Sequence, residues 1–401
     1  MRVVLSTFGS RGDVEPLVGL AVRLREHGAE VVVCAPPDED FAALLAGAGV
    51  AMVPVGPSAR ELTQAPPASV SIPERAAQII GAQFEAVDAV TRDADLLVAT
   101  GAMPAAAGAL SVAERHGVRS VSVTFQQLTL PSARRGPLAY RGKPFPPEVT
   151  DTAALWELDA RHADELFAAA LNTHRAAAGM APVVGVRDYV VGRRPWLATD
   201  PTLDPWTGAP GLAVVQTGSW LLPDTRPLAP ELVEFLAAGA PPVYVGFGSM
   251  ALHGSTDVAE VALTTARALG RRVVLARGWA ELSAEGTDDD CFVVGEVNQQ
   301  ELFTRVAAVV HHGGQGTTTT ATRAGAPQVV VPQLADQPYW AGRVAELGIG
   351  VAHAGAAPTV DSLTTALRTA LSPDTARRAR EVAGLIRTDG VAVAARLLLT
   401  A

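Results

Sequence analysis

The 401-residue chain has few cysteines, no long apolar run and a deficit of positive charge, and each shortage excludes a class of protein. Its two cysteines, Cys34 and Cys291, are far apart and form no C-x-x-C pattern, which argues against a disulfide framework or a zinc site. No apolar run reaches about 18 residues, so we expect no membrane span. The N-terminus lacks the pattern of a signal peptide, so a cytoplasmic protein is expected.

Lys and Arg total 32 against 41 Asp and Glu, which gives a formal net charge of −9. Basic pairs such as Arg134-Arg135 and Arg271-Arg272 are scattered rather than arranged in a stripe. The sequence therefore does not predict binding to nucleic acid. Hydrophobic residues make up 48% of the chain, enough for large cores, and the length favours two domains.

Short β-branched runs alternate with longer segments of helical periodicity, which is typical of parallel β-α-β units. In the first half we expect strands over 2–7, 30–35, 51–55, 95–100 and 119–124, and helices over 17–27, 41–48 and 105–116. The pattern restarts with strands over 242–247, 272–276, 291–294, 307–311 and 328–331, and helices over 258–269 and 316–324. We therefore predict an α/β fold of two facing Rossmann-like, doubly wound parallel-sheet domains with a cleft between them.

Six prolines between positions 199 and 230 interrupt regular structure and mark a linker. We place the first Rossmann-like domain at 1–200, the proline-rich linker at 201–220 and the second domain at 221–380. Residues 381–401 are expected to form a C-terminal helix. One option is that this helix packs back on the first domain.

The run His311-His312-Gly313-Gly314-Gln315-Gly316-Thr317 joins a buried strand to the start of a helix. Unsatisfied N–H groups and the positive end of the helix dipole would point at one spot there, which predicts an anion site. Its three glycines let backbone approach a phosphate, Thr317 can donate its hydroxyl, and a histidine can add a hydrogen bond or a charge. A tight structural turn with a buried histidine is the alternative, whereas a zinc site at the His pair lacks ligand spacing.

Two more polar elements follow strands of the second half. Ser249 suits contact with a phosphate or ribose, and its surroundings lack the G-x-S-x-G pattern of a hydrolase. Asp336-Gln337 suits bidentate hydrogen bonds to vicinal sugar hydroxyls, and a helix cap is the alternative for this pair.

The loop 9–16 after the first strand is not a G-x-G-x-x-G fingerprint, and strand 30–35 ends without an acidic residue, so an NAD site is disfavoured. Asp13 lies at this strand-to-helix turn, where a carboxylate could deprotonate an acceptor hydroxyl. The alternative is that Asp13 only caps the helix that begins near Pro16.

Six motifs together resemble the vancomycin-group antibiotic glycosyltransferases, within the family 1 inverting glycosyltransferases of GT-B fold. They lie at 9–16, 215–220, 246–249, 295–298, 311–317 and 332–338, so the resemblance covers nearly the whole chain. It implies metal-independent, inverting transfer of a sugar from a nucleotide-sugar cosubstrate to a small-molecule aglycone, with no cofactor. A monomer or weak dimer is expected.

The resemblance also implies roles for individual residues. The second domain would hold the donor, with the base against the backbone of Val297, the diphosphate at Ser249, His312, Gly314, Gly316 and Thr317, and the sugar at Asp336 and Gln337. Gly313 and Gln315 would complete the donor turn, and Ser10, Arg11 and Gly12 would border the donor beside Asp13, the implied general base. The acceptor would lie on the first domain.

Some positions depart from the family. Relatives commonly have Ala at Gln315 and Tyr at Trp340, and the loop 125–149, with four basic residues and five prolines, does not resemble the glycopeptide-binding members. Glycopeptide, polyketide and other aromatic acceptors stay open, as do a dTDP-linked deoxysugar and UDP-glucose as donor. Asp288-x-Asp290 matches a metal motif of the other glycosyltransferase fold, but its polar run is better explained as a solvated loop.

Two other functions fit the same motifs. A sugar-nucleotide 2-epimerase of GT-B fold would share the phosphate turn and need no acceptor. A non-catalytic nucleotide-sugar binding protein would keep the turn and need no base at position 13.

Overall fold

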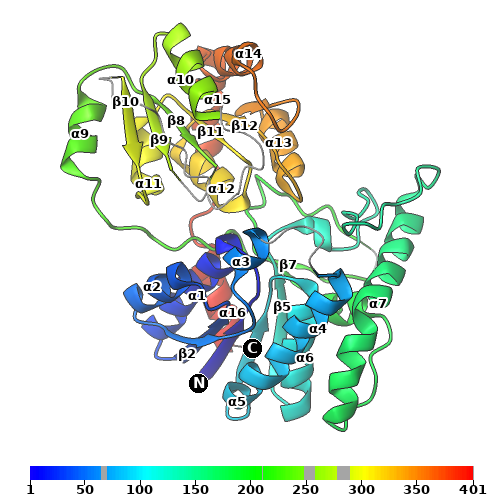
Figure 1. Ribbon diagram of the computed structural model, residues 1–401. Helices are drawn as coiled ribbons and strands as arrows, with labels where there is room; N and C mark the ends of the chain where they lie inside the picture. Colours follow the sequence, from blue (N-terminus) through cyan, green and yellow to red (C-terminus); the bar gives the residue numbers. More distant parts are fainter. Residues whose placement is uncertain (65–69, 210, 248–257, 278–289, 401) are drawn as a thin grey trace. The chain divides into compact units, whose positions relative to one another are not determined.

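The computed structural model describes residues 1–64, 70–209, 211–247, 258–277 and 290–400 (Figure 1). The chain forms two compact units. Unit 1 consists of Met1–Asp200, Pro205–Leu222 and Thr388–Ala401, and unit 2 of Pro201–Asp204 and Pro223–Arg387. Each unit contains its own parallel sheet with helices packed against it (Figure 1).

Unit 1 is built on a seven-stranded parallel sheet in the order β3-β2-β1-β4-β5-β6-β7. Its strands are β1 (Arg2–Ser6), β2 (Glu30–Ala35), β3 (Ala51–Pro54), β4 (Leu96–Ala99), β5 (Arg119–Thr124), β6 (Trp196–Leu197) and β7 (Val215–Gln216). Its α-helices are α1 (Arg11–Glu26), α2 (Glu39–Gly47), α3 (Ala59–Gln64), α4 (Ile72–Ala82), α5 (Asp88–Thr91), α6 (Met103–His116), α7 (Thr152–Ala177), α8 (Val186–Val191) and α16 (Gly390–Thr400).

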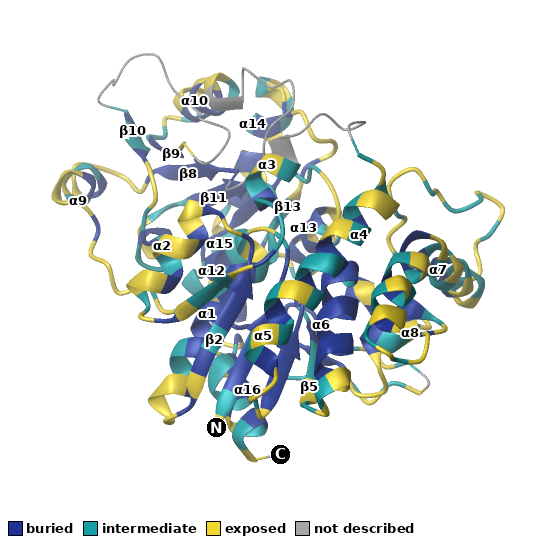
Figure 2. Cartoon of the chain, turned by 60° about the horizontal axis from the view of Figure 1, so that its bottom comes forward, coloured by how far each residue is buried: buried dark blue, intermediate teal, exposed yellow. Residues whose placement is uncertain are grey.

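Both faces of this sheet are covered, because successive residues of its strands pack into different cores. In β1, Val3 and Leu5 lie in the core beneath α1, α2 and α16, whereas Val4 lies in the core beneath α4, α6 and α7. This explains why the strands have continuous apolar runs rather than alternating ones. Figure 2 shows these strands as buried and the exposed residues on the outward sides of the helices.

Unit 2 has a six-stranded parallel sheet in the order β10-β9-β8-β11-β12-β13. Its strands are β8 (Val243–Gly246), β9 (Val273–Ala276), β10 (Cys291–Val294), β11 (Ala308–His311), β12 (Gln328–Val330) and β13 (Gly350–Ala352). Its α-helices are α9 (Pro230–Ala237), α10 (Val258–Ala268), α11 (Gln299–Leu302), α12 (Gln315–Ala324), α13 (Gln337–Glu346), α14 (Val360–Ala370) and α15 (Pro373–Ala383).

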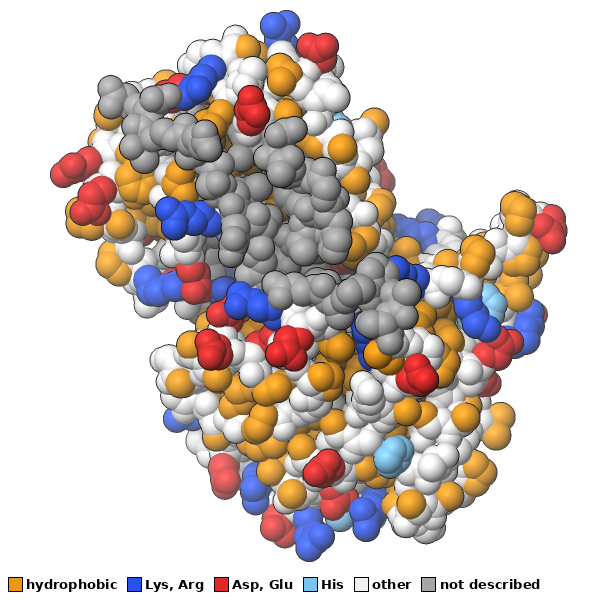
Figure 3. Space-filling view, in the orientation of Figure 1, with side chains coloured by type: hydrophobic (Ala, Val, Ile, Leu, Met, Phe, Trp, Pro, Cys, Tyr) orange, Lys and Arg blue, Asp and Glu red, His pale blue; other side chains and the backbone are white. Residues whose placement is uncertain are grey.

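The two sheets confirm the predicted fold class of two Rossmann-like, doubly wound units. All ten predicted strands are present, each with its bounds within one residue of the prediction. The unpredicted strands β6, β7 and β13 have only two or three residues, too few for a periodic pattern. Among the described residues, no helix has the length and apolarity needed to cross a membrane. Basic and acidic side chains are interspersed on the face drawn in Figure 3.

Helix α1 begins at Arg11, six residues before the predicted start at 17. Pro16 lies inside this helix, and Ser10 caps it. The prediction was wrong because it took Pro16 to mark the helix start, whereas the Ser10 cap sets the start at Arg11 and α1 tolerates Pro16 in its second turn, without the N–H that would bond the Gly12 oxygen. Asp13 therefore belongs to the first turn of α1.

The segments expected as a linker and a terminal helix both contribute to unit 1. Strand β7 lies within 201–220 and pairs with β6, which extends the first sheet. Helix α16 packs on α1 through Ala394, Ala395 and Leu398, which join the same core. The Arg119 guanidinium donates to the backbone oxygen of Leu398 at 2.8 Å.

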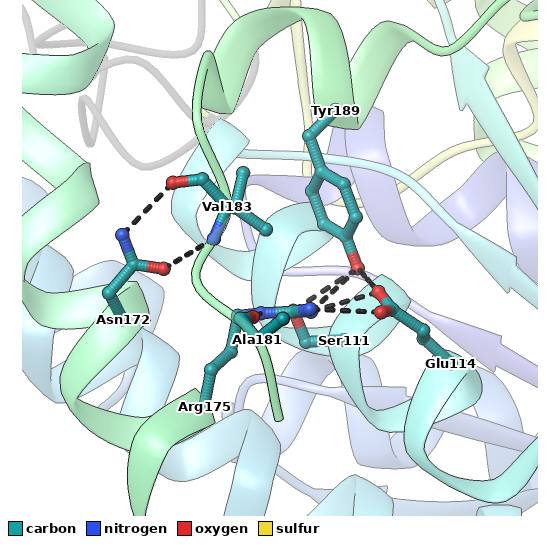
Figure 4. Close-up of polar contacts among 7 residues, drawn as sticks. All are labelled: Ser111, Glu114, Asn172, Arg175, Ala181, Val183 and Tyr189. Atoms are coloured by element: carbon teal, nitrogen blue, oxygen red, sulfur yellow. Dashed lines mark hydrogen bonds and ion pairs between the residues drawn. The ribbon is translucent and has the colours of Figure 1, made fainter. Parts of the chain in front are cut away.

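A buried arginine, Arg175 in α7, ties this helix to α6 and α8 (Figure 4). Its guanidinium donates to both carboxylate oxygens of Glu114 at 2.9 Å, to Ser111 Oγ at 3.0 Å and to the backbone oxygen of Ala181 at 2.8 Å. The Tyr189 hydroxyl donates to the same carboxylate at 2.8 Å. Hydrogen bonding to Arg175 holds the pKa of Glu114 below its usual value.

We expect Arg175→Met to lower the free energy of unfolding by about 2 kcal/mol, because the buried Ser111 hydroxyl and the Ala181 oxygen lose their charged donor. Urea denaturation would measure the change. Arg377→Met is the control, since Arg377 contacts two acidic residues on an exposed surface, where ion pairs add little to stability. Equal effects of the two substitutions would contradict the role given to the buried cluster.

Candidate active site

In unit 2, the turn 312–317 follows β11, and the pair Asp336-Gln337 follows the neighbouring strand β12. Gly246, His311 and Val330 are in register across β8, β11 and β12, so the loops that follow them leave the same edge of the sheet. Strands β8 and β11 are adjacent although β9 and β10 separate them in sequence. This is the point at which the strand order reverses, where open α/β sheets bind their ligands.

The predicted anion turn joins β11 to α12. Gly314 is the N-cap of α12, and no side chain among the described residues caps this helix. Gly313 has φ +95°, and a Cβ there would lie 2.7 Å from Val330 Cγ1. A Cβ at Gly316 would meet no atom of the described residues within 4 Å. The helix start is therefore open to an anion on its N-terminal side, and the turn is too tight for a side chain at Gly313.

His311 holds this turn in place rather than facing a ligand. Its Nδ1 accepts from the Gly313 N–H at 3.1 Å, so the ring proton is on Nε2, which lies 2.9 Å from Gln328 Oε1. The Gln328 amide in turn donates to Thr322 Oγ1 at 3.0 Å. Burial and the neighbouring His312 lower the pKa of His311 to about 3, so its ring is neutral at pH 7. No role was assigned to His311 from the sequence, because its partner Gln328 is 17 residues away.

His312 is the histidine that retains hydrogen-bonding capacity. Its Nδ1 is buried and has no partner among the described residues. Burial lowers the pKa of this ring to about 4. The sequence left open whether a histidine adds a hydrogen bond or a charge. A neutral His312 can offer a phosphate a hydrogen bond at pH 7 but not a full charge. Its Nε2 lies so near Gly314 that a Cβ at that glycine would be 2.6 Å away.

The loop after β12 carries Asp336 and Gln337. The Gln337 oxygen accepts from the backbone N–H groups of Gln333 and Leu334 at 2.7 and 3.1 Å, which stabilises the loop. Asp336 is the N-cap of α13, yet its side chain makes no capping bond and instead accepts from the Trp340 indole at 2.7 Å. Burial raises the pKa of Asp336, and the indole N–H opposes that rise. Ala335 has φ +55°, a strained conformation of the kind found at functional sites.

If Asp336 contacts the donor sugar, we expect Trp340→Phe to move the acid limb of the kcat/KM profile to higher pH. Loss of the indole N–H removes a stabiliser of the ionised carboxylate, so its pKa rises further and the active, ionised form is lost at a higher pH. Initial rates at subsaturating donor between pH 5 and 8 would measure the shift. Trp206→Phe is the control, because it makes the same substitution in unit 1 rather than beside Asp336. Superimposable profiles for Trp340→Phe and the parent would contradict this role.

Val297 follows β10, and its neighbour Asn298 fixes the segment. Asn298 caps α11 and donates through Nδ2 to the backbone oxygens of Asp224 and Arg226 at 3.0 and 2.8 Å. This explains the asparagine in the 295–298 motif, to which no role was given. Ser249 and Asp288 lie outside the described residues, whereas Asp290 pairs with Arg267 at 2.7 Å.

In unit 1, Asp13 caps α1 and also lines a cavity. Its Oδ2 accepts from the Ser10 backbone N–H at 2.8 Å, and Ser10 Oγ accepts from the Gly12 N–H at 3.3 Å, which forms a capping box. A Cβ at Gly9 would lie 2.1 Å from that Asp13 oxygen, so the carboxylate packs directly on glycine. Arg11 pairs with Glu15 on the same helix at 2.7 Å. Asp13 therefore does cap α1, as the alternative interpretation predicted, and this hydrogen bond fixes the position of its carboxylate.

The cavity has a volume of about 120 Å³ and lies at the carboxyl ends of β1, β4 and β5. Strands β1 and β4 form the point of order reversal in the first sheet. Apolar side chains of α6, α8 and the loop after β5 line much of it, among them Met103, Phe125, Leu130 and Val190. Among the described residues that line the cavity, Asp13 alone carries a charged side chain. The carboxylate therefore borders a mainly apolar space of limited size.

Two family models match the chain. Residues 3–132 match the glycosyltransferase family 28 N-terminal domain, and residues 268–393 match the C-terminal domain of the erythromycin biosynthesis protein CIII-like family. The chain is 52% identical to glycosyltransferase GtfE of Amycolatopsis orientalis over 404 residues, covering 100% of this chain and 98% of that protein. The chain belongs to the vancomycin-group glycosyltransferases. The resemblance inferred from the six motifs is confirmed.

This vancomycin-group glycosyltransferase is also 51% identical to the vancomycin aglycone glucosyltransferase of Amycolatopsis orientalis, with coverage of 100% and 98%. Identity to the dTDP-epi-vancosaminyltransferase of the same organism is 46%, with coverage of 95% and 93%. Among solved structures, the glycotransferase of kitacinnamycin is 21% identical with a TM-score of 0.74, covering 99% and 98% of the two chains. That likeness agrees with the GT-B fold class.

Proposed function

We propose that this glycosyltransferase moves a sugar from a nucleoside diphosphate to a hydroxyl of a natural-product aglycone, with inversion and without a metal ion. The observation that carries the proposal is the start of α12 at Gly314, which no described side chain caps, next to a His312 nitrogen that has no partner in the described part of the chain. Such a helix start suits a diphosphate, which is the leaving group of sugar-nucleotide donors.

The donor is a dTDP-linked deoxysugar or UDP-glucose. The names of relatives support both sugars, since one is a dTDP-epi-vancosaminyltransferase and another a glucosyltransferase. In the proposed complex the base rests against Val297, and the diphosphate contacts Ser249, His312, Thr317 and the backbone of the turn. Asp336 and Gln337 face the sugar, with Gln337 using its amide N–H because its oxygen holds the loop.

The proposed reaction is a single displacement. A new bond forms between the acceptor oxygen and the anomeric carbon, while the bond from that carbon to the diphosphate oxygen breaks. Asp13 takes the proton of the acceptor hydroxyl, and the diphosphate leaves with the electron pair of the broken bond. The start of α12 and the neutral His312 stabilise the charge that develops on the leaving group, as preorganised dipoles do.

The acceptor is an aglycone of an antibiotic or related natural product. One relative is named for the vancomycin aglycone, which supports a glycopeptide. The loop 125–149, with its prolines and basic residues, differs from glycopeptide-binding members and keeps polyketide and other aromatic scaffolds as candidates.

A donor-by-acceptor screen read by mass spectrometry tests the proposal. dTDP-deoxysugars and UDP-glucose would each be incubated with glycopeptide, polyketide and aromatic aglycones, with and without EDTA. The expected result is a glycosylated product with inverted anomeric configuration and unchanged yield in EDTA. Isomerised sugar released from donor alone would indicate an epimerase, and nucleotide-sugar binding without any nucleoside diphosphate release would indicate a binding protein.

A further inference from the structure

A relay of hydrogen bonds between buried side chains links strand β12 to the turn at the start of α12. Gln328 in β12 lies between His311 and Thr322, and all three side chains are buried. The Gln328 Oε1 is 2.9 Å from His311 Nε2, and the Gln328 amide nitrogen donates to Thr322 Oγ1 at 3.0 Å. The Thr322 hydroxyl in turn donates to the backbone oxygen of Thr318 at 2.7 Å. The relay therefore runs from the turn, through β12, and back to the first half of α12.

The direction of every bond in this relay is fixed at Thr322. Its hydroxyl has one proton, and a backbone oxygen can only accept, so that proton is used on Thr318. Thr322 Oγ1 must then accept from the amide of Gln328, which turns the Gln328 oxygen toward His311. Because that oxygen can only accept, the His311 proton lies on Nε2, and Nδ1 is left as an acceptor.

Both ends of the relay act on the turn itself. His311 Nδ1 accepts from the Gly313 N–H at 3.1 Å, which holds Gly313 at φ +95° just before Gly314, the N-cap of α12. Thr318 binds the Gly314 oxygen with its backbone N–H at 2.9 Å and with its hydroxyl at 2.8 Å. The turn is thus fixed on both sides of the helix start, where first-turn N–H groups are available to an anion.

We propose that Gln328 is a positioning residue for the donor diphosphate, which acts through the His311 ring and does not touch the ligand. By keeping His311 Nδ1 free of a proton, Gln328 holds Gly313 and the first N–H groups of α12 in one arrangement before the donor binds. A site that is ordered in advance loses less conformational freedom on binding and so binds more tightly. This inference rests on the proposed function, because it takes the turn as the diphosphate site.

Two substitutions of Gln328 test the relay in different ways, with dTDP and UDP as probes. Gln328→Met keeps the side-chain length but offers no strong acceptor, and we expect binding about tenfold weaker than in the parent at every pH between 5 and 8. Gln328→Glu keeps an acceptor and adds a negative charge, which raises the pKa of His311 from its low value of about 3. The protonated ring has no acceptor for the Gly313 N–H. Relative to the parent, binding should be nearly equal at pH 8 and about tenfold weaker at pH 5.

The sign of this pH effect distinguishes positioning from direct contact. If His311 contacted the diphosphate, a protonated ring would attract the anion, and Gln328→Glu would bind more tightly at pH 5. Among the described groups, His312 is the titratable one that acts on the charge of His311, and its own pKa of about 4 leaves it largely neutral over this range. Calorimetric titration of parent and variants at each pH gives the ratio, from which the titration of the nucleotide cancels. Tighter binding of Gln328→Glu at pH 5, or a ratio that does not change with pH, would overturn the proposal.

Helix α12 supplies a matched pair of threonines. Thr322→Val removes the hydroxyl that sets the direction of the relay, and we expect nucleotide binding to weaken about fivefold. Thr322→Ser should restore it. Thr319→Val makes the same change at a buried hydroxyl that has no partner in the described part of the chain, so its binding should match the parent. Thermal melts would verify that the variants fold, and equal losses in the two valine variants would contradict the relay.

NMR measurements without nucleotide separate this proposal from the proposed function. In the parent, the ring nitrogens of His311 should show a proton on Nε2 and none on Nδ1 at both pH 5 and pH 8, and the Gly313 N–H should be protected from hydrogen exchange. In Gln328→Glu at pH 5, Nδ1 should gain a proton and that protection should fall. If these results hold but the parent binds neither dTDP nor UDP, the proposed function fails and the relay stands only as a device that orders the turn. If nucleotide binds normally while His311 Nδ1 of the parent carries a proton, the role of Gln328 is wrong.

Discussion

Asp13→Asn is expected to lower kcat about 10²–10⁴-fold, the usual contribution of a general base. The amide cannot take the proton of the acceptor hydroxyl. It can still accept from the Ser10 backbone N–H, which lies 2.8 Å from Asp13 Oδ2, so the cap of α1 should persist. The free energy of unfolding should therefore change by less than about 1 kcal/mol. Steady-state rates with saturating donor and acceptor measure the loss.

Glu15→Gln is the control for Asp13→Asn. It makes the same carboxylate-to-amide change two residues along α1, at a side chain that pairs with Arg11 and does not line the cavity. We expect its turnover to stay near that of the parent. Nucleoside diphosphate binding should be unchanged in both variants. If the turnover of Asp13→Asn stays within about threefold of the parent, Asp13 is not the general base and only caps α1.

Gly313→Ala is expected to weaken binding of nucleoside diphosphate about a hundredfold, equivalent to about 2.7 kcal/mol. Gly313 has φ +95°, and the added Cβ would lie 2.7 Å from Val330 Cγ1 and 3.2 Å from the backbone oxygen of Gln337. The turn must move to relieve these contacts, which breaks the bond from the Gly313 N–H to His311 and displaces the start of α12. Titration calorimetry with dTDP and UDP measures the affinity.

Gly270→Ala distinguishes this effect from general backbone strain. Gly270 lies in the same unit with φ +64°, but a Cβ there would meet none of the described residues within 4 Å. It should lose about 1 kcal/mol of stability and keep its affinity for nucleoside diphosphate. If Gly313→Ala binds dTDP and UDP as tightly as Gly270→Ala does, the turn is not the diphosphate site.

The strands could be predicted closely because buried parallel strands have a strong local signature. Val31 to Val33 and Val309-Val310 are continuous apolar runs followed by glycine or helix signals, and both runs lie in strands. The start of α1 was misjudged because Pro16 gives a local signal that the Ser10 cap overrides. The two-residue strands β6 and β7 depend on neighbours distant in sequence, so no local pattern marks them.

In the candidate site, too, local features could be predicted from the sequence and contacts between distant residues could not. Glycines and helix starts are visible in the chain, so the turn at 311–317 could be identified. The roles of His311, Asn298 and Trp340 depend on partners, respectively Gln328, the backbone near Asp224, and Asp336.

The course of the chain has a consequence for hybrid enzymes. The segment from Thr388 onward belongs to unit 1, and α16 contributes Ala394, Ala395 and Leu398 to the core beneath α1. A chimera made by one crossover near position 222 would graft a foreign α16 onto that core. Exchange of units between relatives therefore needs a second junction near position 387, so that α1 and α16 come from the same parent.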